Sequence, residues 1–230
     1  TTALLGAKGI MLNIFDMMGN GVNEDWGYDK MLADIKPFAS ALASHRLNMQ
    51  KLRGIKVLVD QDSAYTAHTT FGKEPEELLP HEKNWASLLA SFGFATTILP
   101  VQNDLAIENQ TIAIAGQLLR NLSNEQITNL ITKNTVLLDG ESIQVLLDRK
   151  LGNLLHIQSA KWHPCKSGYQ SFEQADGTTV QGVKNPRITM LQHTGNYLQL
   201  DYQTDSNVKI WSSAYNSIDQ KLGNFMAVID

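Results

Sequence analysis

Five short apolar runs, rich in β-branched residues, dominate the middle of the chain. They are Ile55–Val59, Ala95–Leu99, Thr111–Ala115, Thr135–Leu138 and Asn153–Ile157. Near-continuous apolar runs of this length are typical of parallel strands that are buried on both faces. Helical patterns lie between most of these runs, so the sequence predicts a doubly wound α/β layer built on a parallel sheet.

Three of the intervening segments predict helices. The first places apolar side chains at positions 85, 88, 89 and 92, and Gly93 supplies its stop. The second opens with a capping box formed by Ser123 and Gln126. The third follows a strand-to-helix turn that begins at Asp139.

The pattern before this layer is different. An apolar run, Gly9–Asp16, leads into a glycine-rich polar loop, Met17–Asp29, and then into a helical pattern between Met31 and Leu42. Pro37 within that pattern predicts either a kink or the start of a new helix. One strand and one helix cannot bury the edges of the strand, so this unit requires more sheet from elsewhere.

After Ile157 the helical periodicity stops. The stretch from Trp162 to Gly182 is polar and rich in turn residues. Alternating patterns predict antiparallel strands at Ile188–Gln192, Tyr197–Tyr202, Val208–Trp211 and Phe225–Ile229. The expected domains are therefore a β/α unit over residues 1–50, an α/β domain over 51–158 and a small C-terminal antiparallel β region over 159–230.

The composition of the chain limits the kinds of molecule that it is expected to bind. A net charge of −4 and the lack of a basic cluster argue against nucleic acid and anionic membranes, and no apolar run is long enough to span a bilayer. Cys165 is the single cysteine, so an internal disulfide is excluded. The compartment stays open between cytoplasm and periplasm. Because the chain opens at Thr1 without a methionine, we expect a piece of a longer protein.

The candidate binding residues follow from strand position. Ligands of open parallel sheets sit beyond the carboxyl ends of the strands. This rule selects Asp60, Gln61, Asp62, Ser63, Gly116, Gln117, Asp139, Gly140, Glu141, Ser142 and, after the fifth run, His156. The competing interpretation is that these side chains cap helices and satisfy loop backbone, as every such fold requires.

The sequence identifies no catalytic residue. A tight strand-turn-helix corner can present a nucleophile, but Glu141 occupies the central position here and Ser142 lacks the usual glycine context. Cys165 and His163 lie outside the α/β layer and are too few for a metal site. Phosphate-loop, dinucleotide and zinc-protease motifs are missing, so no cofactor is expected. Two glycosylation sequons, at Asn109 and Asn121, abut a strand and a helix cap and are interpreted as structural.

The order of these pieces resembles a known arrangement. The stretches Val57–Ala64, Trp85–Gly93, Ala115–Ser123 and Val136–Ser142 are similar to the glutamine-amidotransferase-like middle domain of barrel-type glycoside hydrolases, which in β-galactosidases is called the trimerisation domain. Residues Gly9–Asp16 and the following helix resemble the last unit of the preceding barrel, and the region after Ser159 resembles the start of the C-terminal β domain.

The resemblance implies a flavodoxin-like fold, related to class I amidotransferases, without their cysteine nucleophile. The catalytic carboxylates of the family belong to earlier barrel strands that this chain lacks, so the piece is expected to be inert by itself. The family's domain helps subunits to assemble, which implies a homo-oligomer whose carbohydrate substrate is bound by the parent enzyme. The loop that contains Trp26 would lie at the carboxyl face of the barrel, where Trp26 could line a sugar site.

Two other functions remain open. The chain could be an independent flavodoxin-like module that binds a small polar ligand at the loops Asp60–Ser63 and Asp139–Ser142. It could also be an amidotransferase-like or hydrolytic enzyme that acts through Glu141, Ser142 or Cys165.

Overall fold

The structure is a computed structural model. It describes residues 27–45, 53–69, 78–101, 106–163, 171–189, 196–204, 206–216 and 218–230, of which 171, 172, 188 and 189 are described by their backbone only. The chain divides into two compact units, Thr1–Arg53 and Gly54–Asp230. The predicted strand Gly9–Asp16 and the loop residue Trp26 lie outside the described residues.

Helix α1 (Tyr28–Ser44) is the described part of the first unit. It continues through Pro37, so one helix covers the whole pattern in which a kink or a second helix was predicted. None of its residues is buried, and the apolar side chains of Met31, Ile35 and Phe38 are all exposed. These three positions recur at helical spacing and form an exposed apolar stripe.

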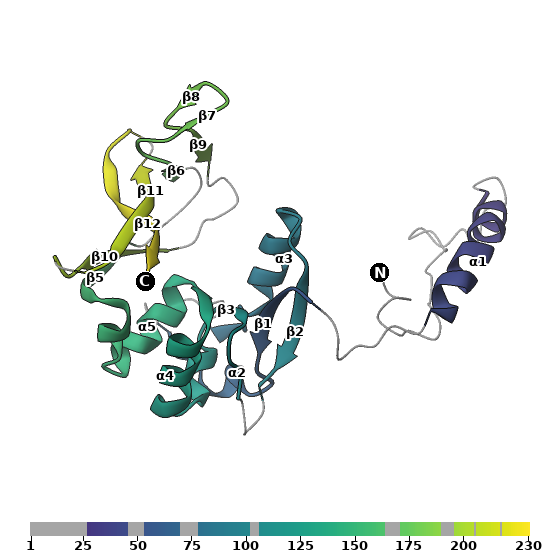
Figure 1. The fold of residues 1–230 in the computed structure, drawn as a ribbon, viewed down its shortest axis with the longest axis horizontal. Helices are drawn as coiled ribbons and strands as arrows, with labels where there is room; N and C mark the ends of the chain where they lie inside the picture. Colours follow the sequence, from purple (N-terminus) through teal and green to yellow (C-terminus); the bar gives the residue numbers. More distant parts are fainter. Residues whose placement is uncertain are drawn as a thin grey trace. The chain divides into compact units, whose positions relative to one another are not determined.

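A four-stranded parallel sheet forms the centre of the second unit (Figure 1). Its strands run in the order β2-β1-β3-β4. They are β1 (Ile55–Val59), β2 (Thr96–Pro100), β3 (Thr111–Ile114) and β4 (Thr135–Leu138). The prediction of an α/β layer with a parallel sheet is therefore confirmed for four of the five apolar runs.

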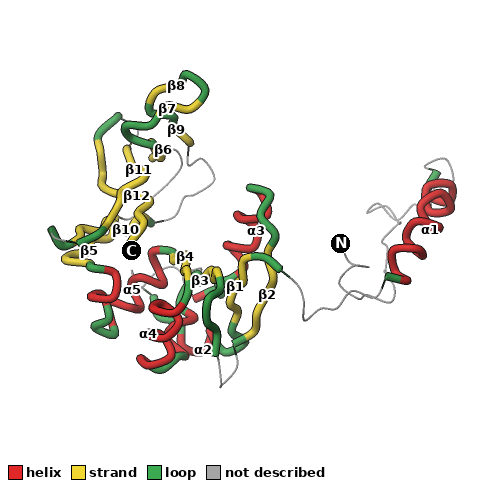
Figure 2. Tube along the Cα trace, viewed as in Figure 1, coloured by secondary structure: helices red, strands yellow, loops and turns green. Residues whose placement is uncertain are grey.

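Helices cover both faces of this sheet (Figure 2). They are α2 (Ser63–Thr66), α3 (Lys83–Ser91), η4 (Leu118–Asn121), α4 (Asn124–Lys133), α5 (Gly140–Asp148) and η5 (Gly152–Leu155). Neighbouring residues of a strand point to opposite faces. Val57 accordingly packs with Leu89 of α3, whereas Leu58 belongs to the cluster that contains Ile127 of α4 and Leu146 of α5. None of the helices in the described ranges is both long and apolar enough to cross a membrane.

The run Asn153–Ile157 does not form a fifth parallel strand, so that prediction is wrong. The chain turns through η5, and His156 follows with a left-handed backbone (φ 52°). Leu155 and Ile157 still reach the core cluster. Because a short apolar run can be buried as a turn as well as a strand, its hydrophobicity alone did not separate the two outcomes.

The remaining strands form the small antiparallel region that was predicted. Strand β5 (Ile157–His163) pairs with β10 (Tyr197–Tyr202). A second sheet has the order β12-β11-β6-β9. Its strands are β6 (Ser171–Gln174), β9 (Arg187–Thr189), β11 (Val208–Asn216) and β12 (Lys221–Ile229). Two further strands, β7 (Thr179–Val180) and β8 (Val183–Lys184), form a separate hairpin. The stretch Trp162–Gly182 thus contains strands where only turns were expected.

Gly54 fixes the entry of the chain into the sheet. Its φ is +130°, and a Cβ atom there would lie 2.5 Å from the carbonyl oxygen of Ala95. The same carbonyl accepts a hydrogen bond from the backbone N–H of Ile55 (2.9 Å). A side chain at position 54 would therefore separate β1 from β2 where their pairing begins.

Candidate functional site

The carboxyl ends of β1, β3 and β4 lie along one edge of the sheet, because the strands are parallel. Asp60, Gly116 and Asp139 occupy this edge, one or two residues beyond the ends of their strands. The strand-end rule therefore selected residues that the structure does bring to one edge of the sheet. The contacts of each side chain show what it does there.

Asp60 organises the loop that follows β1. Its Oδ1 accepts a hydrogen bond from the backbone N–H of Asp62 (3.0 Å), and its Oδ2 accepts one from Asn121 Nδ2 (2.5 Å). Thr66 Oγ1 donates to Asn121 Oδ1 (2.5 Å), and Ser63 Oγ donates to the Asp60 carbonyl (2.9 Å). These contacts tie α2 to η4, so Asp60, Ser63 and the sequon residue Asn121 have structural roles at this edge.

Gln117 ties the same loop to η4 from the other side. Its Nε2 donates to the His68 carbonyl (2.7 Å), while its Oε1 accepts hydrogen bonds from the His68 backbone N–H (2.9 Å) and from Arg120 Nε (2.7 Å). Both ends of the amide are therefore engaged. The arrangement fixes the loop near His68 and supports the capping interpretation for this residue.

Asp139 is the N-cap of α5 and is half-buried. Its Oδ1 accepts a hydrogen bond from the Ser142 backbone N–H (2.8 Å), and its Oδ2 accepts one from the Gly116 backbone N–H (2.9 Å). Burial raises the pKa of the Asp139 carboxyl to about 6, although these hydrogen bonds favour the charged form. Gly116 has a positive φ of 71°, and a Cβ there would lie 3.2 Å from the Cβ of His81.

Ser142 faces the interior of the protein. The residue is fully buried, and its Oγ donates to the carbonyl oxygens of Ile114 (3.2 Å) and Gly116 (3.1 Å). Gly140, the first residue of α5, packs beside Leu198 of β10. The hydroxyl of Ser142 therefore locks the corner between β3 and α5 and is not presented to a substrate.

Glu141 pairs with His81, a residue that the sequence patterns did not identify. Glu141 Oε2 lies 2.6 Å from His81 Nδ1, and both side chains are partly exposed. The hydrogen bond to Glu141 raises the pKa of His81 above its ordinary value, while burial acts in the opposite direction. The two residues are 60 positions apart, so no local spacing could have revealed the pair.

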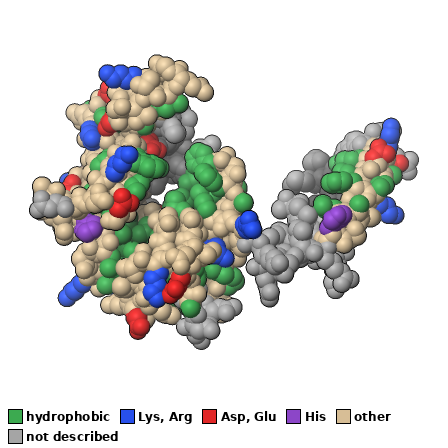
Figure 3. Space-filling model, in the orientation of Figure 1, with side chains coloured by type: hydrophobic (Ala, Val, Ile, Leu, Met, Phe, Trp, Pro, Cys, Tyr) green, Lys and Arg blue, Asp and Glu red, His purple; other side chains and the backbone are tan. Residues whose placement is uncertain are grey.

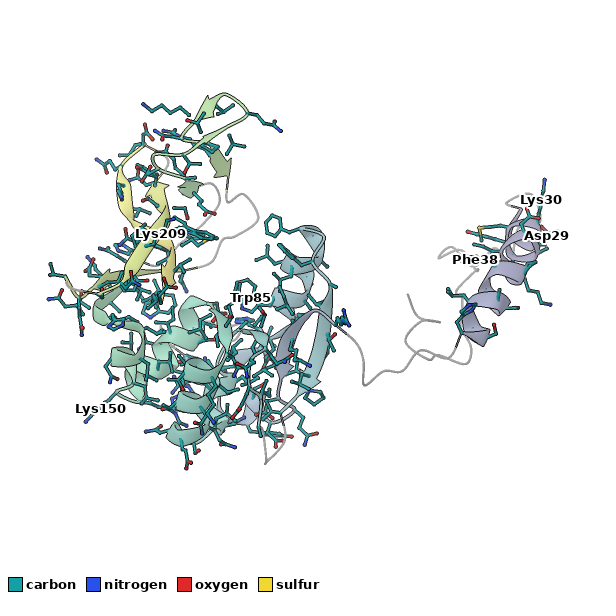
Figure 4. All side chains as sticks on the ribbon, in the orientation of Figure 1. Asp29, Lys30, Phe38, Trp85, Lys150 and Lys209 are labelled. Atoms are coloured by element: carbon teal, nitrogen blue, oxygen red, sulfur yellow. The ribbon has the colours of Figure 1, made fainter. Side chains whose placement is uncertain are left out.

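A carboxylate that holds one imidazole nitrogen leaves the other available for proton transfer. His81 and Glu141 have that geometry, and helix α3 begins two residues after His81. Trp85 anchors this helix to the sheet by donating from Nε1 to the Ile114 carbonyl (2.9 Å) (Figure 4). Nucleophilic catalysis also needs an accessible hydroxyl or thiol beside the base, and Ser142 does not supply one. In the described ranges no three His, Cys, Asp or Glu side chains gather to hold a metal ion.

A hollow of about 650 Å³ lies beside Asp60, between the carboxyl ends of β1 and β2. We call it the Glu82 hollow. Its apolar lining comes from Val59, Pro80, Pro100 and Val101, and its polar lining comes from Asp60, Gln61, Glu82 and Lys83. This volume falls within the range of small-molecule sites.

Glu82 is the unusual residue of this hollow. It is only 4% exposed, and its Oε1 has no hydrogen-bond partner in the part of the chain that the structure describes. A buried acceptor without a partner costs about 1–3 kcal/mol. Sequence reasoning missed Glu82 because it lies at the start of a helix, where an acidic residue is ordinary.

The structure gathers the predicted residues into two groups. Gly116, Asp139, Glu141 and Ser142 meet at one corner, and Asp60 and Gln61 border the Glu82 hollow. His163 lies elsewhere, with Nε2 2.8 Å from Gln199 Oε1 and its ring stacked on Tyr197. Cys165, the other half of the proposed thiol pair, lies outside the described residues, as does Trp26.

Comparisons of this chain with protein-family models, with curated proteins and with solved structures return no match.

Proposed function

We propose that this chain is a non-catalytic accessory domain that assembles the subunits of a carbohydrate-active enzyme of the β-galactosidase-like glycoside hydrolase type. The strand order β2-β1-β3-β4 supports the flavodoxin-like part of the proposal, because it equals the first four positions of the flavodoxin-like order 2-1-3-4-5. A fold supports many functions, so the argument for assembly has to come from the surface.

The observation that carries the proposal is an exposed apolar surface at the end of α3. Leu88, Phe92 and Phe94 are 40%, 65% and 56% exposed, and we call them the α3 patch. Figure 3 shows the hydrophobic side chains gathered over this helix. Exposed aromatic side chains that lie together are typical of protein interfaces. The partner that fits a homo-oligomer is a second copy of this chain.

The contacts at the opposite edge of the sheet support a role without turnover. Ser142 is buried, Asp139 is half-buried, and both are hydrogen-bonded to the backbone of their own corner. Glu141, at the position where an amidotransferase would carry its nucleophile, is paired with His81. These side chains hold the corner together, and the Ser142 hydroxyl is engaged by backbone carbonyls of that corner.

Light scattering of the 230-residue chain over a concentration series tests the proposal. The chain should self-associate, and the double variant Phe92→Ser/Phe94→Ser should dissociate it, because burying one Phe side chain contributes roughly 1.5–3 kcal/mol. Tyr65→Ser is the matched control, since Tyr65 is 86% exposed but follows the carboxyl end of β1. A strict monomer at high concentration would contradict assembly. Dissociation by Phe38→Ser alone would place the interface on α1 instead.

The parent enzyme is tested separately, by sequencing the coding DNA on both sides of this segment. A long upstream frame with β/α repeats and carboxylates at the ends of two strands would support the glycosidase parent. A start codon immediately before Thr1 would contradict it.

An independent ligand-binding module is the second candidate function. The observation that favours it is the Glu82 hollow, which has the volume of a small-molecule site and lies at the carboxyl ends of β1 and β2. This hollow borders the carboxyl edge of the sheet, whereas Phe92 and Phe94 precede the amino end of β2. Ligand binding and assembly can therefore be tested with separate variants.

A further inference from the structure

We propose that two copies of this chain pair through the outer edges of their β2 strands, in antiparallel orientation, so that their two parallel sheets join into one continuous sheet. The inference rests on the proposed assembly function and specifies the surface that would carry it. Strand β2 supplies the backbone groups that pair, and helix α3 supplies the apolar cover.

Strand β2 is an outer strand of the parallel sheet (Figure 1). Two hydrogen bonds fix which of its backbone groups face β1: Ile55 N–H donates to the Ala95 carbonyl (2.9 Å), and Val101 N–H donates to the Val59 carbonyl (2.8 Å). Because backbone groups point to alternate sides along a strand, residues 95, 97, 99 and 101 face β1. The backbone groups of residues 96, 98 and 100 therefore face away from β1, and within the described ranges no strand pairs with them.

The side chains of β2 do not oppose pairing at this edge. The strand, Thr96–Pro100, carries no charge, and Ile98 at its centre is 50% exposed. Natural edge strands are usually protected by charged side chains or by a covering element, because they otherwise pair with other chains. Pro100 removes one outward donor at the end of the strand but keeps its carbonyl. The other outer strand, β4, differs, since its valine and its two leucines are all half-buried.

Strand β2 is complementary to itself when Ile98 lies beside a two-fold axis. Ile98 of each copy would then exchange two N–H···O bonds with Ile98 of the other copy, and each Thr96 N–H would donate to the Pro100 carbonyl of the other copy. Both outward N–H groups of the strand thus find an acceptor. Each copy uses this edge once, so the product is a closed dimer.

Helix α3 would pack against its own copy across the same junction. Ile98 is level with Val57, which packs with Leu89 of α3, so Ile98 lies on the face of the sheet that α3 covers. A two-fold axis perpendicular to the sheet keeps both α3 helices on that face. Since α3 contacts both β1 and β2, and strands are about 4.8 Å apart, the two helices would lie about 10 Å apart, as packed helices do. The pairing would therefore bring the two α3 patches together.

Amide hydrogen exchange in β2, measured beside light scattering of the 230-residue chain, tests the pairing. In the dimer, the N–H groups of Thr96 and Ile98 should exchange as slowly as those of Thr97 and Leu99, which face β1 in either state. On dilution to the monomer, Thr96 and Ile98 should exchange roughly a hundredfold faster, whereas Thr97 and Leu99 should change little. A dimer in which Thr96 and Ile98 exchange as fast as in the monomer would reject the pairing and leave the assembly function standing.

Ile98→Lys is the variant that tests the register, because position 98 of one copy lies directly opposite position 98 of the other. It should raise the dissociation constant at least about tenfold, since two apolar side chains lose their cover and like charges face each other. Ile210→Lys, at a 38% exposed position of β11 outside this sheet, is the matched control and should leave the dissociation constant unchanged.

The outcomes separate this inference from the function on which it rests. Undiminished association of Ile98→Lys would overturn the pairing alone, and so would a trimer of the unmodified chain, because identical edges paired antiparallel close at two copies. A strict monomer would overturn both the pairing and the assembly function.

Discussion

Asp139 shows how one half-buried carboxyl connects two strands and a helix. It accepts backbone hydrogen bonds from Gly116, after β3, and from Ser142, in the first turn of α5. Burial nevertheless raises its pKa from 3.8 to about 6. The folded protein therefore binds this proton more tightly than the unfolded chain does. The resulting contribution to stability is complete below pH 3.8 and is lost as the pH rises through 6.

Asp139→Asn should remove this pH dependence. A shift of about two pKa units corresponds to roughly 2–3 kcal/mol. We therefore expect the free energy of unfolding of the unmodified protein, measured relative to that of the variant, to fall by about this amount between pH 4 and pH 7. Urea unfolding across this range measures it. Asp62→Asn, at an exposed position in the loop after β1, serves as the control and should leave the slope intact.

The residues of the sheet edge could be predicted in position but not in role. The strand-end rule identified Asp60, Gly116 and Asp139, because it needs only the ends of the strands. It missed His81 and Glu82, because these residues follow no strand and lie just before the start of helix α3. His81 pairs with Glu141, which is 60 positions away in the chain, and Glu82 borders the hollow. Neither relation can be predicted from the spacing of nearby residues.

Helix α4 shows an element whose start the sequence did determine. Ser123 Oγ accepts a hydrogen bond from the Gln126 backbone N–H (3.1 Å), and Gln126 Oε1 accepts one from the Ser123 backbone N–H (2.8 Å). The predicted capping box is confirmed in both directions. Such a signal can be predicted because both partners lie within one turn of the chain.

Ser123→Ala should destabilise the protein by about 1 kcal/mol, the usual cost of removing an N-cap hydroxyl. Thr128→Ala provides a control within the same helix, because the hydrogen bond that its hydroxyl donates to the Asn124 carbonyl (2.8 Å) is exposed. That change should stay within about 0.5 kcal/mol. Urea unfolding of both variants gives the comparison, and equal losses would contradict a specific capping role.

The run Asn153–Ile157 shows the opposite case, an element that local pattern could not decide. A segment can pair with a sheet as a strand only if the preceding elements place it beside a free strand edge. Burying Leu155 requires only that its side chain reach the core. The same limit applies to the order of the strands, which places β1 between β2 and β3 although β1 comes first in the chain. Order follows from crossover connections that residue patterns do not encode.

At the scale of the second unit, the parallel sheet and the strands β5 and β10 share one core. Leu198 and Leu200 of β10 belong to the same buried cluster as Ile112 of β3. Trp162 of β5 packs against this cluster and donates from Nε1 to Gln144 Oε1 of α5 (2.8 Å). The two kinds of sheet are therefore expected to unfold together.

Leu198→Ala should lower the stability of both parts by about 2–4 kcal/mol, because it leaves a cavity in the shared core. The unfolding of each part can be followed by tryptophan fluorescence. One variant retains only Trp85, in the α/β layer, and the other retains only Trp162, in β5. Their urea midpoints should coincide and should shift together in Leu198→Ala. Val180→Ala, at a half-exposed position in the β7–β8 hairpin, should shift neither midpoint. Separate midpoints would show two independent folding units.

The glycine that opens β1 has a practical consequence for protein engineering. Because Gly54 is the first residue of the second unit in the chain and tolerates no side chain, cloning scars, affinity tags and fusion joints that replace it would damage the first pairing of the sheet. A cut placed at or before Arg53 leaves that pairing whole. Gly54 is therefore the latest residue at which the second unit can begin when it is produced by itself, for crystallisation or for grafting onto another enzyme.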